Sequence, residues 1–431
     1  MNVSEFLLKI KNGEFDSGFA GLYGEDAVEY QRDRYSAAAE KFVETYPDAT
    51  EIEVFSASGR TEICGNHTDH QHGCVLAAAV DVDVISIVAF NQSGVMRVLS
   101  EGYRPVEIDC GNLGLQEGET GSAALIRGVA AKFAERGIEI GGFDMYSTSD
   151  VLAGSGISSS AAFETIIGTV IDKHYAGGKV GAVEIAKIGQ FAENVYFGKQ
   201  CGLMDQMVSS VGGFVFIDFE DNENPIIENY SVDFDSLGYD LFITDTKGSH
   251  ADLTDDYVAV RSEMNEVAAF FGKKYLRETD KDLFVENIAA IREKCSDRAV
   301  LRAMHFMAEN LRPKAGFEAL KAGDVDGFLR QVRESGLSSE RLLQNIYSVK
   351  KPLEQAVNVG LALSREVLGE QGASRVHGGG FAGTIQAFVP KALSAQYKAA
   401  LDAVFGEGSC RLMRIRPVGG IDFFEFAEGR C

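Results

Sequence analysis

The chain has 431 residues, of which 45% are hydrophobic and 24% are charged, and its 41 Lys and Arg against 64 Asp and Glu give a formal net charge of −23. These proportions are those of a folded globular protein with room for two or three domains, so wholesale disorder is excluded. The negative charge repels phosphate backbones and no Lys/Arg cluster offsets it, so we expect no nucleic-acid partner, whereas a nucleotide can still bind through backbone N–H groups and a metal ion.

The seven cysteines are scattered and form no C-x-x-C pair. This pattern favours free thiols in a reducing cytosol over a disulfide framework or a zinc site. The N-terminal residues lack the basic start, apolar run and small-residue cleavage site of a secretion signal. The most apolar stretch, residues 73–90, is interrupted by Asp81 and Asp83, which is not the pattern of a membrane span. We therefore expect a cytoplasmic protein with no membrane partner.

Strands and helices are expected in both halves of the chain. Beta-branched runs between Gly-rich turns predict strands from Glu51 to Phe90, and an apolar repeat at helical spacing predicts a helix from an N-cap at Ser122 to a terminal glycine at Gly137. Further along the chain we expect helices over 160–174 and 182–197, strands at 214–219 and 240–246, amphipathic helices from 255 to 368, and a loop and strand over 372–390. The polar stretch 219–235 is the expected boundary between domains of residues 1–220 and 221–431, and the fold class is α+β.

The segment from Asp150 to Glu164 has the features of a phosphate-binding loop. Gly154 and Gly156 permit a tight turn with converging backbone N–H groups, and the three serines that follow open an Ala-rich helix whose N-terminal dipole attracts an anion. A simpler interpretation is a capped helix after a glycine turn. No G-K-[ST] Walker loop, H-R-D or D-F-G kinase segment, or G-x-S-x-G elbow occurs in the chain, so those nucleotide-binding and hydrolase classes are excluded.

A second glycine cluster, residues 377–383, precedes the apolar run 384–390. Three consecutive glycines supply backbone conformations that other residues adopt only at a cost. The cluster predicts either a tight turn before a strand or a backbone that must closely approach a ligand or the first glycine loop.

Residues 59–73 crowd an arginine, an asparagine, an aspartate and three histidines into what we expect to be a turn between two strands. His67, His70 and His72 suggest a metal site, but no H-E-x-x-H helix and no clear acidic ligand accompany them. The alternative is a polar sugar-binding loop, because short and rigid donors and acceptors can hold several hydroxyls at once. We favour the sugar-binding loop.

Glu193, at the end of one predicted helix, and Asp205, at the start of the next, flank an interruption at Cys201 and Gly202. An aspartate near a helix N-terminus stabilises the helix by about 0.3–1 kcal/mol, which by itself explains its presence. The same dipole keeps the carboxylate ionised, and an ionised aspartate that faces a substrate hydroxyl suits phosphoryl transfer.

Together these four segments resemble the motifs of the galactokinase branch of the GHMP small-molecule kinases. The sugar signature is similar to GRTEICGNHTDHQHG, the phosphate loop to GSGISSSAA, the aspartate motif to CGLMDQ and the third motif to HGGGFAG, in the family's order from about Val54 to Pro390. The resemblance implies an N-terminal domain of ribosomal-protein-S5-like character, a C-terminal α/β domain, and an active site in the cleft between them.

The resemblance also implies an activity, namely Mg²⁺-dependent transfer of a phosphoryl group from ATP to the anomeric hydroxyl of galactose. By position, Asp205 matches the catalytic aspartate and Arg60 the arginine beside it, and Ser160 and Glu193 match the Mg²⁺ ligands. The positions that match the ATP-binding loop are Gly154, Ser155, Gly156, Ile157, Ser158, Ser159, Ser160 and Ala161. The positions that match sugar contacts are Asn66, His67, Asp69, Asp205 and Tyr257.

Asn66 departs from the family pattern, which usually has Glu at this position in the run G-E-H-T-D. That glutamate typically accepts a hydrogen bond from the hydroxyl on carbon 6 of galactose, whereas a neutral amide would also tolerate a carboxylate there. Plant galacturonate kinases are similar in lacking this glutamate, so galacturonate is an alternative substrate. A non-catalytic sensor of galactose and ATP is a further alternative, against which the retained serine–alanine run 160–162 and Asp205 argue.

Two other properties follow from the length and pattern of the chain. The chain is longer than many galactokinases, and we place the extra helical length between about residues 273 and 344, without a function. The oligomeric state is open, with a monomer favoured, because no exposed coiled-coil heptad or single apolar patch can be recognised.

Overall fold

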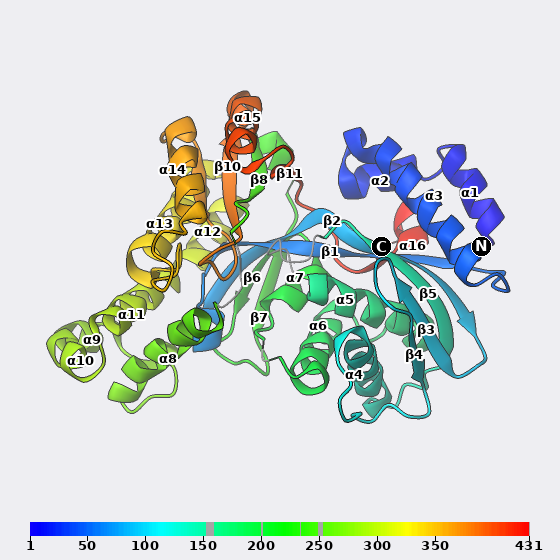
Figure 1. Cartoon of the computed structure of the whole chain (residues 1–431), viewed down its shortest axis with the longest axis horizontal. Helices are drawn as coiled ribbons and strands as arrows, with labels where there is room; N and C mark the ends of the chain where they lie inside the picture. Colours follow the sequence, from blue (N-terminus) through cyan, green and yellow to red (C-terminus); the bar gives the residue numbers. More distant parts are fainter. Residues whose placement is uncertain (152–158, 200, 233, 249–252, 431) are drawn as a thin grey trace.

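The computed structural model describes residues 1–151, 159–199, 201–232, 234–248 and 253–430. These residues form two β-sheets, and helices cover the faces of both (Figure 1). The larger sheet has eight strands in the order β12-β1-β2-β5-β3-β4, and β6 and β7 extend it beside β2. The smaller sheet has four strands in the order β11-β8-β10-β9.

The larger sheet is built around the long strand β2. The first half of β2 pairs with β6 and the second half with β5, while β1 runs along its other edge. The strands of this sheet are β1 (Glu53–Cys64), β2 (Cys74–Asn91), β3 (Val95–Ser100), β4 (Val106–Asp109), β5 (Gly142–Ser149), β6 (Phe214–Asp218), β7 (Ile226–Tyr230) and β12 (Ile421–Asp422). The end of β1 and the start of β2 therefore lie together, with only the loop 65–73 between them.

Helices cover both faces of the larger sheet (Figure 1). Successive residues of a strand point to opposite faces, so Val54 packs beneath the N-terminal helices while Phe55 packs on the other side, against the helices that follow β4. On the first face lie α1 (Val3–Lys11), α2 (Asp16–Tyr23), α3 (Val28–Thr45) and α16 (Phe423–Ala427). On the second face lie α4 (Gly121–Glu135), α5 (Ser159–Ile171), α6 (Ala182–Phe191) and α7 (Met204–Val211).

The smaller sheet is joined to the larger one by two helices. Phe317 and Phe328 on these helices pack against Leu76 and Phe214 of the larger sheet and Phe388 of the smaller sheet. The strands of the smaller sheet are β8 (Tyr239–Asp245), β9 (Ala373–Val376), β10 (Thr384–Pro390) and β11 (Cys410–Met413). Its helices are α12 (Arg312–Lys321) and α13 (Val325–Ser338) on the inner side and α14 (Ala356–Leu368) and α15 (Ser394–Phe405) on the outer side. A helical lobe beside them holds α8 (Thr254–Phe270), α9 (Lys281–Glu286), α10 (Ile288–Lys294) and α11 (Asp297–Glu309).

The α+β class expected from the sequence is confirmed, and the predicted helices and strands have the expected type. The helix predicted from an N-cap at Ser122 is α4, but its N-cap is Thr120, two residues before the predicted cap, and Gly137 follows its end with a left-handed φ of +80°. The helices predicted over 160–174 and 182–197 are α5 and α6, and each continues into a π-helical segment, Asp172–Ala176 and Ala192–Phe197 respectively.

Two expectations differ from the structure. Residues 59–64, expected in a turn, form the second half of β1, and only residues 65–73 form the turn. The division at residue 220 does not follow the sheets either, because β7 and β12 belong to the larger sheet although both lie beyond that residue. The chain returns to the larger sheet at its end because Ile421 and Asp422 pair with β1.

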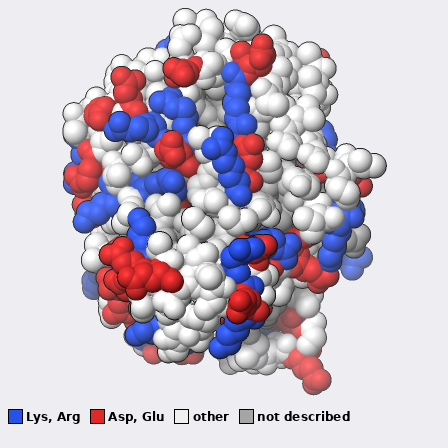
Figure 2. Space-filling view, turned by 90° about the vertical axis from the view of Figure 1, so that its left-hand side faces the viewer, with Lys and Arg blue, Asp and Glu red and all other residues white. Residues whose placement is uncertain are grey.

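Basic and acidic side chains are interspersed on the face shown in Figure 2, so the described residues offer no extended basic surface on that face. The six cysteines of the described part of the chain are free thiols. Within that same part, no helix combines the length and the apolar character that a bilayer crossing requires.

Asp83 ties three distant segments together in the interior. Its carboxylate accepts hydrogen bonds from Arg34 Nη1 at 2.7 Å, Arg416 Nη1 at 2.8 Å and the Tyr23 hydroxyl at 2.6 Å. Burial raises the pKa of Asp83, but the two guanidinium groups outweigh burial and hold its pKa below the ordinary value. Because Arg416 lies between β11 and β12, this ion pair holds the end of the chain on the larger sheet.

We expect Asp83→Asn to lower the free energy of unfolding by about 3–5 kcal/mol, because buried Arg416 would lose its counter-charge and buried Arg34 would keep only Asp150, at 3.2 Å. Asp16→Asn is the control, since its partner Arg32 lies near the surface and the loss should stay below about 1 kcal/mol. Urea unfolding followed by circular dichroism measures both variants. Equal losses in the two variants would contradict the structural role of Asp83.

Candidate active site

Three of the sequence motifs meet at one cavity of about 510 Å³. Its wall contains the end of β1, the loop 65–73, residues 201–204 at the start of α7, and the glycines 378–379. Tyr257 and Arg261 of α8 close a further side. Segments far apart in the sequence are therefore brought to one place, at the junction of the two sheets.

Arg60 and Asp205, the predicted catalytic pair, form a bidentate ion pair. Arg60 Nε donates to Asp205 Oδ1 at 2.7 Å, and Arg60 Nη2 donates to Asp205 Oδ2 at 2.8 Å. Arg60 is buried on β1, while the Asp205 side chain, in the first turn of α7, is 34% exposed. Two parallel hydrogen bonds fix the plane of a carboxylate, so Asp205 is held in one orientation.

The loop 65–73 has a backbone path that depends on left-handed residues. Gly65, His67 and His72 have φ values of +100°, +57° and +59°. A Cβ at Gly65 would lie 2.5 Å from the carbonyl oxygen of Cys74, so only glycine fits there. Thr68 holds the turn by donating its hydroxyl to the Gly65 carbonyl at 2.7 Å. The loop thereby turns its polar side chains toward the cavity.

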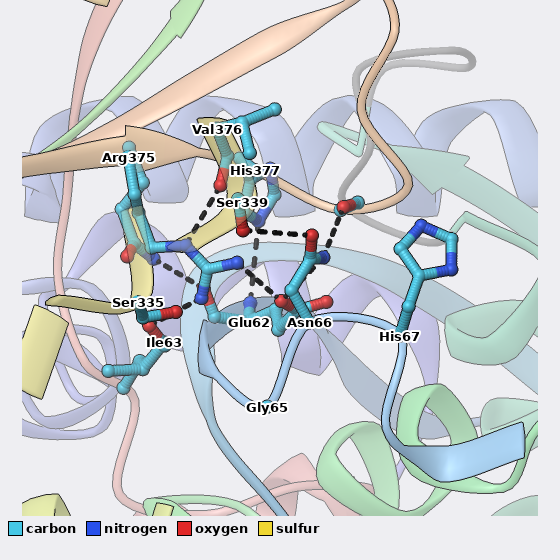
Figure 3. Close-up of polar contacts among 12 residues, drawn as sticks. Glu62, Ile63, Gly65, Asn66, His67, Ser335, Ser339, Arg375, Val376 and His377 are labelled. Atoms are coloured by element: carbon cyan, nitrogen blue, oxygen red, sulfur yellow. Dashed lines mark hydrogen bonds and ion pairs between the residues drawn. The ribbon is translucent and has the colours of Figure 1, made fainter. Parts of the chain in front are cut away.

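Asn66 lies at the inner end of this loop and is buried in a polar network (Figure 3). Its Nδ2 donates to Glu62 Oε1 at 2.9 Å and to the Gly378 carbonyl at 2.8 Å. Its Oδ1 accepts from Asn345 Nδ2 at 2.8 Å and from the Ser339 hydroxyl at 3.3 Å. The amide therefore connects the loop to β1, to Ser339 and Asn345 beyond the end of α13, and to the third motif. Its role in positioning the loop was not expected from the sequence.

The other predicted sugar-binding residues also line the cavity. His67 Nε2 lies 2.9 Å from the Gly379 carbonyl oxygen, and the Tyr257 hydroxyl donates to the Gly380 carbonyl at 3.0 Å. Burial raises the pKa of Asp69, and the nearby His67 offsets this only in part. A Cβ at position 202 would lie 2.1 Å from Asp69 Oδ2, so the glycine of the aspartate motif leaves room for the Asp69 carboxylate in its present position.

The three histidines of the loop do not converge. The His67 and His70 rings are 5.7 Å apart, and the His72 ring stacks on Tyr275 at 3.8 Å. Burial and the neighbouring His67 lower the pKa of His70 well below its usual value, so its imidazole is neutral near pH 7. Across the described residues, no three His, Cys, Asp or Glu side chains are arranged to hold a metal ion. The metal-site interpretation of this loop is therefore not supported.

Helix α11 packs behind the loop 65–73, which is the predicted sugar loop. No function was predicted from the sequence for this helical region. Glu309 Oε1 accepts the backbone N–H of Gly65 at 2.7 Å, while its Oε2 pairs with Arg312 at 2.7 Å. One turn earlier, His305 Nε2 lies 2.9 Å from the Asn66 carbonyl oxygen. The spacing of His305 and Glu309, four residues apart, places both on one helix face. The spacing of the two residues is visible in the sequence, but the loop residues that they contact are not.

The predicted metal ligands, Ser160 and Glu193, lie together on α5 and the π-helical end of α6. The Ser160 hydroxyl is 3.4 Å from Glu193 Oε1, and the same oxygen binds the Lys199 ammonium at 2.8 Å. Glu193 Oε2 accepts from Gln206 Nε2 at 2.8 Å. A carboxylate and a hydroxyl are oxygen ligands of the kind that Mg²⁺ prefers, although the Lys199 ammonium occupies one of the two carboxylate oxygens.

A second cavity, of about 410 Å³, lies beside Ser159 and Ser160. The exposed ring of Tyr103 and the apolar side chains of Leu125 and Phe163 line it. Sequence reasoning did not identify this wall, because its residues come from separate segments without a motif. The predicted cradle residues Gly154, Ser155, Gly156, Ile157 and Ser158 lie outside the described residues, and Ala161 is buried in α5.

Residues 40–90 match the family model of the galactokinase galactose-binding signature, and residues 124–213 match that of the GHMP kinases N terminal domain. A galactokinase of Glaesserella parasuis serovar 5 (strain SH0165) is 31% identical over 355 residues, which cover 81% of this chain and 88% of that protein. A galactokinase of Actinobacillus pleuropneumoniae serotype 5b (strain L20) is 30% identical over 358 residues, which cover 82% of this chain and 89% of that protein.

Solved structures share the fold. The structure of Lactococcus lactis galactokinase complexed with galactose matches with a TM-score of 0.76 and 23% identity, over 90% of this chain and 100% of that chain. The Methanococcus jannaschii mevalonate kinase matches with a TM-score of 0.60 and 12% identity, over 85% of this chain and 98% of that chain. The two-sheet architecture is thus the architecture of GHMP kinases.

Glu309 makes a testable contribution to stability at acid pH. Burial raises its pKa, but His305, Arg312 and Arg375 outweigh burial and lower the pKa from 4.5 to about 2. A carboxylate with a depressed folded-state pKa stabilises the fold above its unfolded pKa, and this stabilisation is lost as the pH falls toward the folded pKa. Relative to Glu309→Gln, the wild type should therefore lose about 3 kcal/mol of its advantage between pH 5 and pH 2.

Urea unfolding of the wild type and Glu309→Gln between pH 6 and pH 3 measures this difference. Above pH 5 the gap between the two free energies of unfolding should be constant, and below that pH it should shrink. A gap that stays the same down to pH 3 would show that Glu309 is not held ionised by its surroundings.

Proposed function

We propose that this chain, which belongs to the galactokinase family of the GHMP kinases, transfers the γ-phosphoryl group of ATP to the anomeric hydroxyl of galactose. The products are galactose 1-phosphate and ADP. The observation that carries the proposal is the bidentate ion pair of Asp205 with Arg60, since Arg60 lies in the wall of a polar cavity that the loop 65–73 completes.

Asp205 and Arg60 perform the reaction at the anomeric hydroxyl in this proposal. Phosphoryl transfer passes through a loose transition state, so most of the rate comes from positioning and from neutralisation of charge. Asp205 orients the sugar hydroxyl and accepts its proton as the oxygen–phosphorus bond forms. Arg60 keeps the carboxylate plane fixed and steadies the negative charge that develops on the transferring group.

His67, Asp69 and Tyr257 bind the sugar in this proposal, since all three line the cavity and Asp69 lies close to the start of α7. Asn66 has its amide filled by protein groups. It therefore acts by positioning the loop rather than by contacting the sugar. This assigns Asn66 a role different from the one implied by the family pattern.

ATP occupies the second cavity in this proposal, with its adenine against Tyr103 and its phosphates near Ser159 and Ser160. Val151 and Ser159 both line that cavity, and the assignment of residues 154–158 to the phosphate cradle rests on the sequence motif alone. Ser160 and Glu193 would hold Mg²⁺, which neutralises charge on the phosphate oxygens when it is bound.

The test is coupled ADP release by the purified full-length protein with ATP and Mg²⁺. Galactose, galacturonate, N-acetylgalactosamine and glucose are compared by kcat/KM. We expect galactose to be preferred by about a hundredfold, which corresponds to about 2.7 kcal/mol of transition-state binding. A preference for galacturonate would mean that the proposed substrate is wrong and the proposed reaction is right. Binding of ATP and galactose without ADP release would indicate a sensor.

Asp205→Asn should reduce kcat by about 10²–10⁴-fold, because the amide cannot accept the hydroxyl proton, while galactose binding measured by calorimetry changes only a few-fold. Asp144→Asn is the matched control, because Asp144 also forms a bidentate ion pair, with Arg97, outside the cavity. The kcat of Asp144→Asn should be close to that of the wild type. Near-normal turnover of Asp205→Asn would reject the assignment of the catalytic aspartate.

A further inference from the structure

Glu62 is a buried carboxylate in the wall of the sugar cavity, and no role described so far uses it. The residue is 4% exposed and follows Arg60 by two positions on β1. Its Oε1 accepts from Arg375 Nη2 at 2.7 Å and from Asn66 Nδ2 at 2.9 Å. Among the described residues, no hydrogen-bond donor reaches its Oε2. This oxygen is also not one of the fully buried polar atoms that lack a partner. One carboxylate oxygen of Glu62 is therefore available to a ligand.

The side-chain amide of Asn66 has no free group with which to bind a ligand. An asparagine side chain has two N–H donors and two acceptor lone pairs, and all four of those at Asn66 are used by Glu62, Gly378, Asn345 and Ser339. A sugar hydroxyl that reaches this end of the cavity thus meets the free oxygen of Glu62 and not a free group of Asn66.

The position of Glu62 on β1 indicates which part of the sugar it faces. Residues two apart on a strand point to the same face and lie roughly 7 Å apart along it. Both Arg60 and Glu62 line the cavity. If the anomeric hydroxyl lies at Asp205 beside Arg60, as the proposed function requires, Glu62 lies across the sugar ring from the anomeric carbon.

We propose that Glu62 is the specificity-determining residue that accepts a hydroxyl on the far half of the sugar ring and rejects a carboxylate there. This inference rests on the proposed function. Arg375 is fully buried and already neutralised by Glu62, so it offers no spare positive charge to an acidic sugar. A hydroxyl gains a charge-assisted hydrogen bond at Glu62, whereas a uronate brings a second negative charge against it.

The experiment compares wild type and Glu62→Gln with galactose and galacturonate, by kcat/KM for ADP release and by Kd from titration calorimetry. The variant keeps the side-chain shape and leaves the Arg375 charge unpaired. We expect kcat/KM for galactose to fall about tenfold, because a charge-assisted bond becomes a neutral one, and that for galacturonate to rise. An equal fall for both sugars would mean that Glu62 has only a structural role and would overturn the inference.

Glu309→Gln is the matched control for this experiment. Glu309 is also buried, also paired with an arginine and also bonded to the sugar loop, but it does not line the cavity. Its substitution should therefore leave the ratio of kcat/KM for the two sugars unchanged, even if both values fall. A change of that ratio as large as the one in Glu62→Gln would overturn the inference.

Glu62→Asp keeps the charge and is the second variant, which serves if Glu62→Gln does not fold. Glu62→Asp should weaken the binding of galactose and should not raise kcat/KM for galacturonate. A higher kcat/KM for galacturonate would overturn the inference. Failure of the proposed function is distinguishable from failure of the inference. A wild type without ADP release contradicts the function, while the Kd ratio for the two sugars still tests Glu62.

Discussion

The bidentate ion pair between Arg60 and Asp205 is the constraint on which the geometry of the active site depends. It joins the second half of β1 to the first turn of α7, and close by the hydroxyl of Ser209 donates to the Ser58 carbonyl at 2.6 Å. These two contacts hold the strand and the helix together. Because phosphoryl transfer needs fixed positions more than covalent participation, a carboxylate held in this way suits the catalytic role proposed for Asp205.

Buried charges around this pair connect it to the rest of the molecule. Glu62 pairs with Arg375 of β9 and Glu309 with Arg312 at the start of α12. Removing a charge from water is costly, and such pairs persist only when further hydrogen bonds satisfy both partners. Both glutamates also bond to the sugar loop, through Asn66 and Gly65. The second half of the chain therefore determines where the loop of the first half lies.

Arg60 and Glu62 line the cavity from one face of β1 because side chains alternate along a strand. The periodicity of the strand sets their separation. In the proposed function, the distance from the reacting hydroxyl to the Glu62 carboxylate therefore does not depend on the loop 65–73. The helical length around α11, which had no function in the sequence, supports this arrangement through His305 and Glu309.

Several features follow from local sequence alone. The helix at α4, the start of α7 at Asp205 and the glycine turns depend on neighbouring residues, whose backbone preferences are local, and the order of the motifs was enough to indicate the GHMP fold. The contacts of Asn66 with Ser339, Asn345 and Gly378 and of Glu62 with Arg375, which span 273–313 positions, were not predictable, nor was the return of β12 to β1. Such contacts carry no local pattern, because only the packing of the two sheets brings their partners within hydrogen-bonding distance.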